Sequence, residues 1–143
     1  MSETKNSYET ATWANTMGTR LVVLMYDGAI GAVIKALDAI EAGDLEARCK
    51  AVNMAMEVLT HLCEALDFEH GGMVAENLGE LYLSMIARLV RVNMLNDPQP
   101  AREVLSMLKT LYDAWRTLDE RITEQTVAHH PVTVPQPQMR AVG

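Results

Sequence analysis

The sequence predicts an all-α fold, an antiparallel up-down four-helix bundle with a short N-terminal segment and a mobile C-terminal tail. Two long apolar stripes indicate helices, because their members recur at intervals of three and four residues. The connections between the predicted helices are short, which favours antiparallel neighbours. No stretch alternates apolar and polar residues for long enough to indicate a sheet. At 143 residues the chain suits one domain with a core of its own.

The first helix is predicted over residues 17–42, after a polar and irregular segment at residues 1–16. Gly43 supplies its C-terminal stop. The apolar side chains of this helix span a wide arc, which indicates either a central position in the bundle or a face that meets a partner. They form two rows, one of Leu21, Leu24, Met25, Gly28, Ala32 and Ala36, the other of Val22, Tyr26, Ala29, Val33, Leu37 and Ile40.

The second helix is predicted from its capping residue Asp44 to about Leu66, where residues 67–72 break it. Cys49 and Cys63 lie about 21 Å apart on this helix, too far for a disulfide, and are predicted to be buried structural thiols. The stripe of this helix consists of Leu45, Cys49, Val52, Met56, Leu59, Cys63 and Leu66.

The third helix is predicted over residues 73–95, because Pro98 disfavours helix in the residue before it. The fourth is predicted over residues 100–126, which completes a bundle domain at residues 17–126. Residues 127–143 contain three prolines and few large apolar residues, and are predicted to form a flexible tail. The stripe of the fourth helix consists of Val104, Leu108, Leu111, Trp115, Leu118 and Ile122.

Composition excludes several classes of partner. The net charge of −7, without clustered Lys or Arg, argues against nucleic acid. No apolar run approaches the roughly 20 residues that cross a bilayer, so membrane insertion is not expected. The N-terminus lacks the apolar stretch of a signal peptide, which predicts a cytoplasmic protein. Ten methionines fill the core or adapt a surface to varied apolar partners.

Catalytic, metal and cofactor sites are not expected. A ferritin-like metal bundle needs Glu-x-x-His motifs, whereas Glu57 and His61 are four residues apart. His61, in the middle of a helix, leaves histidine phosphotransfer as the alternative function, although its neighbours predict a partly buried, satisfied histidine. His129 and His130 lie in the tail without a second cluster of ligands.

Five groups of residues are spread over about residues 8–118. They are Tyr8; Leu24-Met25-Tyr26-Asp27-Gly28-Ala29; Gly71-Gly72 with Ala75, Asn77-Leu78 and Leu81-Tyr82; Arg88-Leu89-Val90 with Asn93 and Asn96-Asp97; and Glu103-Val104 with Leu108 and Trp115. In this order and spacing they resemble one family, the flagellin export chaperones called FliS. Its family signature is matched here by Tyr8, Tyr26, Asp27, Gly28, Asn93, Asn96 and Asp97.

This resemblance implies a chaperone that binds the disordered C-terminal segment of flagellin in a hydrophobic groove. It prevents premature polymerisation and aids delivery to the flagellar type III export gate. It also implies that residues 1–16, with Tyr8 and Trp13, cap the groove when cargo is absent. An empty apolar groove favours self-association, so a homodimer in the absence of cargo is a further expectation. The residues expected to bind flagellin lie on the first and third helices: Leu24, Met25, Tyr26, Ile30, Met85 and Leu89.

The chain also departs from the family pattern. The first helix often begins with Ser-Pro in the family, whereas Met17-Gly18 stands here, so Thr16 or Thr19 is expected to cap the helix. Ser84 stands where a second aromatic residue is usual. A helical adaptor for another secretion cargo is a further alternative.

Overall fold

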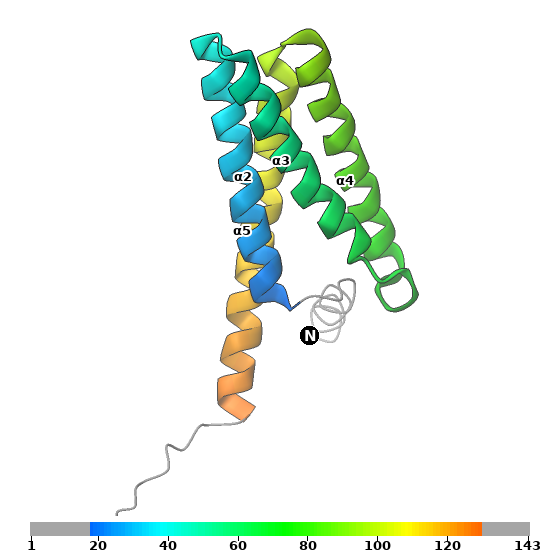
Figure 1. The fold of residues 1–143 in the computed structure, drawn as a ribbon. Coiled ribbons are helices and arrows are strands. Elements are labelled where there is room, and N and C mark those ends of the chain that lie inside the picture. The colour runs from blue at the N-terminus through cyan, green and yellow to red at the C-terminus, as the bar shows by residue number, and fades with distance from the viewer. Residues whose placement is uncertain (1–17, 130–143) are drawn as a thin grey trace, which may run out of the picture.

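The structure is a computed structural model that describes residues 18–129 (Figure 1). The predicted N-terminal segment, with Tyr8, Trp13 and Thr16, and residues 130–143 lie outside this range. Four helices make up the described chain: α2 (Thr19–Ala42), α3 (Leu45–Glu64), α4 (Phe68–Leu95) and α5 (Pro98–His129). They run alternately up and down, and α2 and α4 each pack against both α3 and α5. The predicted all-α four-helix bundle is confirmed, with α2 and α4 at opposite corners.

The ends of α2 and the start of α3 follow simple capping chemistry. Gly43 ends α2 in the left-handed conformation (φ 72°), as predicted. The Asp44 side chain accepts a hydrogen bond from the Ala47 N–H at 3.1 Å and caps α3, also as predicted. The expected threonine cap of α2 is wrong for Thr19. Gly18 is the N-cap without a side-chain bond, and the Thr19 hydroxyl donates to Asp119 of α5 at 2.8 Å.

The third helix is predicted from residue 73, whereas α4 has a short helical segment before it, which begins at Phe68. The Asp67 carboxylate accepts from the backbone N–H groups of Glu69 and His70 at 3.0 and 3.1 Å, so α4 starts at Phe68. At Gly72 the backbone leaves the helical conformation, with φ 51° and ψ −129°, so two helical segments meet there at a kink. The predicted break at the glycine pair is therefore confirmed, and a short helical segment capped by Asp67 precedes it.

The fourth predicted helix is too short at both ends. The Asp97 side chain accepts from the Gln99 N–H at 2.9 Å, and Pro98 suits a first helical position because its missing N–H would lack a helical partner there. At the other end α5 continues to His129, so residues 127–129, predicted as tail, are helical. The stripe of this helix is confirmed, with Val104, Leu108 and Trp115 buried.

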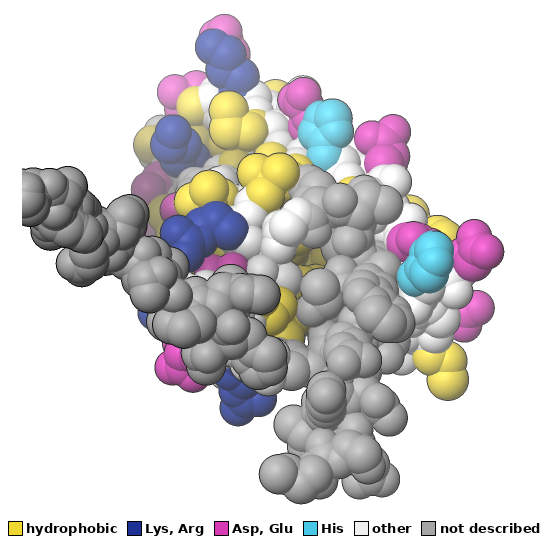
Figure 2. All heavy atoms as spheres, turned by 90° about the horizontal axis from the view of Figure 1, so that it is seen from below, with side chains coloured by type: hydrophobic (Ala, Val, Ile, Leu, Met, Phe, Trp, Pro, Cys, Tyr) yellow, Lys and Arg dark blue, Asp and Glu magenta, His cyan; other side chains and the backbone are white. Residues whose placement is uncertain are grey.

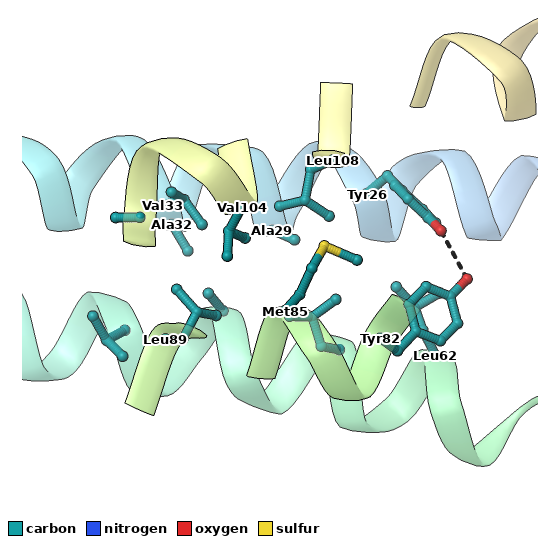
Figure 3. Close-up of a cluster of buried hydrophobic side chains, with 14 of the residues drawn as sticks. Tyr26, Ala29, Ala32, Val33, Leu62, Tyr82, Met85, Leu89, Val104 and Leu108 are labelled. Carbon is teal, nitrogen blue, oxygen red and sulfur yellow. Dashed lines mark hydrogen bonds between the residues drawn. The ribbon is translucent and has the colours of Figure 1, made fainter. Parts of the chain in front are cut away.

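The core lies between all four helices, and Figure 3 shows part of it. The predicted stripe of α3 is partly wrong. Leu45 is exposed, and Cys49 and Cys63 are half-buried free thiols, not buried ones. The buried residues of α3 are Arg48, Ala51, Val52, Ala55, Leu59 and Leu62. α3 packs against both α2 and α4, and buried alanines on both α2 and α3 suit a close approach of these two helices.

Candidate functional site

Two tyrosines tie the diagonal helices together inside the bundle. The hydroxyls of Tyr26 on α2 and Tyr82 on α4 are hydrogen-bonded at 2.7 Å, and both side chains are fully buried (Figure 3). Burial raises the pKa of Tyr82 to about 12 and raises that of Tyr26 well above its usual range. Both phenols therefore stay neutral at physiological pH. The pair serves the packing of the bundle and offers no acid or base.

Arg48 explains two residues of the family signature, although no pattern in the sequence singled it out. Its side chain is only 7% exposed. Its Nε donates to the Asn93 side-chain oxygen at 3.3 Å, and its NH1 group donates to that of Asn96 at 2.6 Å. A further bond reaches the Asn93 backbone carbonyl. A cation at the C-terminal end of α4 also suits the helix dipole. Asn93 and Asn96 thus hold the C-terminal end of α4 against the N-terminal part of α3.

Of the other family-signature residues in the described chain, one caps a helix and two lie on the surface. Asp97 caps α5. Asp27 and Gly28 lie exposed on the outer face of α2. A Cβ added at Gly28 would meet no atom within 4 Å, so this glycine leaves open space beside the helix.

The six residues predicted to bind flagellin do not share one surface. Leu24 is 59% exposed, and Met25 and Ile30 are half-buried on α2. Tyr26, Met85 and Leu89 are fully buried and point into the core (Figure 3). Of these six residues, only the three on α2 other than Tyr26 are accessible to a partner. The binding role of each residue stays a prediction.

A hollow of about 530 Å³ lies on the outside of the bundle between α2 and α3. Four alanines and the exposed Met54 supply the apolar part of its lining, and two lysines and two aspartates supply the charged part. The lining residues are Lys35, Asp38, Ala39, Ala42, Asp44, Ala47, Lys50, Ala51 and Met54. Sequence patterns did not reveal this hollow, because alanines carry little weight in an apolar stripe.

His61 and His70 lie exposed beside carboxylates, and Figure 2 shows histidine side chains among acidic ones at the lower end of the bundle. His61 is exposed, with its ring nitrogens 4.0 Å from Glu57 and 3.5 Å from Glu64, so the expectation of a partly buried histidine is wrong. No observation favours phosphotransfer at this residue. Among residues 18–129, no group of three His, Cys, Asp or Glu side chains is placed to hold a metal ion.

His70 and Asp67 form a pair that titrates. Their side chains meet at 2.7 Å. The hydrogen bond to Asp67 raises the pKa of His70, and the His70 N–H lowers the pKa of Asp67. The raised pKa of His70 means that its protonated form stabilises the folded protein. This contribution is complete below the ordinary histidine pKa of about 6.5 and disappears as pH rises through the raised pKa. The lowered pKa of Asp67 means that its ionised form also stabilises the folded protein. This contribution is complete above the ordinary aspartate pKa of about 3.9 and disappears as pH falls through the lowered pKa.

We expect Asp67→Asn to lower the pKa of His70 toward its ordinary value, because the carboxylate charge is lost while asparagine still caps α4. An NMR titration of the His70 ring protons measures this shift, and circular dichroism checks that the helices persist. An unchanged His70 titration would show that the pair does not form in solution.

None of the described helices is long and apolar enough to span a membrane. Comparison with known proteins adds the family. A family model described as flagellar protein FliS matches residues 1–122. The flagellar secretion chaperone FliS of Salmonella typhimurium is 36% identical over 107 residues, which cover 74% of this chain and 79% of the relative.

Two further relatives agree. The flagellar secretion chaperone FliSB of Pseudomonas aeruginosa is 35% identical over 96 residues, covering 67% of this chain and 76% of the relative. The flagellar secretion chaperone FliS of Campylobacter jejuni is 32% identical over 104 residues, covering 73% and 81%. The chain therefore belongs to the FliS family, a family of flagellar secretion chaperones and not of enzymes.

Proposed function

We propose that this chaperone binds the C-terminal segment of flagellin in the cytoplasm, prevents its premature polymerisation and brings it to the flagellar export gate. Membership of the FliS family supports a flagellar cargo. The observation that carries the binding mode is the accessible apolar surface of α2, where Leu21 and Leu24 are exposed, together with the hollow between α2 and α3.

The physics of such a surface suits a helical segment. Alanines in the hollow admit a close helix. The exposed Leu21 and Leu24 lie about 16 Å or more farther toward the N-terminal end of α2 and provide apolar contacts for an extended segment, as in helix-in-groove recognition. A cargo that folds as it docks loses part of its binding free energy to ordering, which favours later release. Leu24, Met25 and Ile30 are proposed to contact the cargo. Tyr26, Met85 and Leu89 would shape the surface from beneath, since they are fully buried.

We expect Leu24→Glu to weaken flagellin binding by about tenfold, because it places a charge where an apolar contact is lost; tenfold corresponds to about 1.4 kcal/mol. Titration calorimetry with purified flagellin measures the change. Leu83→Glu on the outer face of α4 is the matched control and should leave the affinity unaltered. Equal losses in the two variants would contradict a cargo surface on α2.

Residues 1–16 are proposed to cap this surface when cargo is absent, since the chain enters α2 at Gly18, one to two turns before Leu21 and Leu24. Without such a cap, a homodimer through the same surface is the proposed alternative. Deleting residues 1–15 should raise the fluorescence of a hydrophobic dye or tighten cargo binding. If the deleted chain matches the full chain in both measurements, the capping proposal fails.

A further inference from the structure

The outer face of α4 carries a row of exposed residues spaced like the seam of a coiled coil. Successive members are three, four, three, four, three and four residues apart, so they form one stripe along the helix. Every member is exposed, including four large apolar side chains: Met73 at 74%, Leu83 at 61%, Val90 at 40% and Met94 at 74%. This α4 outer row consists of Met73, Glu76, Glu80, Leu83, Ala87, Val90 and Met94.

The row is distinct from the face that α4 presents to the core. That inner face consists of Ala75, Leu78, Tyr82, Met85, Leu89 and Val92. Single exposed apolar residues are ordinary on protein surfaces. A row in register over about 30 Å of helix differs from such scatter, because a second helix can place its own side chains between the members. The residues at the C-terminal half, from Leu83 onward, are all apolar.

The charge around the row indicates the chemistry of a partner. Residues 51–87 contain no Lys or Arg, although the whole chain has twelve. Two of the carboxylates in this stretch, Glu76 and Glu80, lie within the row itself. The chain has a net charge of −7, and nearly all of it arises here, from Glu57, Glu64, Asp67, Glu69, Glu76 and Glu80. A basic segment is attracted to this end of α4, whereas two copies of a chain with this net charge repel each other.

We propose that the α4 outer row docks a helix of a partner protein that has apolar residues at the same spacing and Lys or Arg opposite Glu76 and Glu80. The partner helix would lie along α4, with its apolar half against Leu83, Val90 and Met94. This surface is separate from the proposed cargo surface, because α2 and α4 occupy opposite corners of the bundle. A partner on α4 can therefore bind while cargo occupies α2.

Two synthetic helical peptides of 28 residues test the proposal. Both carry leucines at alternating intervals of three and four, and their polar positions are filled with Lys and Gln in one peptide and with Glu and Gln in the other. Fluorescence anisotropy with the full chain at low salt measures both affinities. We expect the Lys peptide to bind at least about tenfold more tightly than the Glu peptide, with the difference falling as salt rises.

Paired charge reversals separate a local site from a general effect of net charge. Glu76→Lys with Glu80→Lys should abolish or invert the preference for the Lys peptide. Asp113→Lys with Glu120→Lys changes the net charge equally on exposed positions of α5 and should preserve the preference. Leu83→Glu with Val90→Glu should weaken both peptides, because the apolar half of the row is lost.

Three outcomes would overturn the proposal. Equal binding of the two peptides to the unaltered chain would show that the carboxylates select nothing. An equal effect of the α4 and α5 reversals would reduce the preference to net charge. A dimer in sedimentation that Leu83→Glu with Val90→Glu dissociates would assign the row to a second copy of the chain. Flagellin titration of the same α4 variants keeps this test apart from the proposed cargo binding, which they should leave intact.

Discussion

Truncating Leu89 to alanine is expected to lower the free energy of unfolding by about 2–5 kcal/mol. The Leu89 side chain is fully buried and points from α4 toward Val33 of α2 and Val104 of α5 (Figure 3). Alanine would lose the transfer free energy of the removed atoms and leave a cavity, because close-packed neighbours relax only partly. Urea denaturation followed by circular dichroism measures the change.

Leu83 on the same helix is the matched control, because its side chain is exposed. Leu83→Ala is expected to change the stability by no more than about 0.5 kcal/mol. A small effect of Leu89→Ala, comparable with that of Leu83→Ala, would contradict the core position of Leu89. It would instead favour the sequence-based prediction that Leu89 is free to contact cargo.

Replacing Gly72 by alanine is expected to destabilise the protein by about 1–3 kcal/mol, because φ 51° with ψ −129° is a conformation that side chains with a Cβ avoid. A Cβ at this position would meet no atom within 4 Å, so the cost is one of backbone conformation and not of a clash. Thermal or urea unfolding measures it.

Gly31 is the opposite case and serves as the control. It lies inside α2, and an added Cβ would also meet nothing within 4 Å. Gly31→Ala is therefore expected to stabilise the protein by up to about 1 kcal/mol. Two substitutions of equal chemistry should thus act in opposite directions. If Gly72→Ala were also stabilising, the kink in α4 would not exist in solution.

The helices themselves were predictable from the sequence, because apolar spacing of three and four residues is a strong local signal. Gly43 and Asp44 marked one connection correctly. The glycine pair also marked a real break, since Gly72 is non-helical. The short helical segment before it depends on the cap at Asp67, whose two backbone hydrogen bonds start a helix that has no apolar periodicity of its own to predict it.

Which face of each helix is buried was harder to predict. On α3 the larger Leu45 and Cys49 fit the apolar stripe, yet of these four residues only the small Ala51 and Ala55 are buried. Close packing between helices favours small residues, and the sequence of one helix does not show what the neighbouring helix presents. For the same reason Met85 and Leu89 were predicted on an accessible groove and lie in the core.

Long-range polar contacts were beyond sequence reasoning. Arg48 meets Asn93 and Asn96, residues 45 and 48 positions away, through hydrogen bonds that no spacing along one helix predicts. The resemblance to the FliS family pointed to both asparagines without their role. The contact with α3 supplies that role, which is to hold the end of α4 against Arg48.

Titration of the chaperone with flagellin and with flagellin lacking its C-terminal segment shows whether the chaperone recognises that segment. Isothermal calorimetry should show binding to the intact flagellin and at least a hundredfold loss for the truncated form, which is about 2.7 kcal/mol. The intact complex should also show a large negative heat-capacity change, because apolar surface is buried as the segment folds. Equal affinity for the two forms of flagellin would contradict recognition of the C-terminal segment.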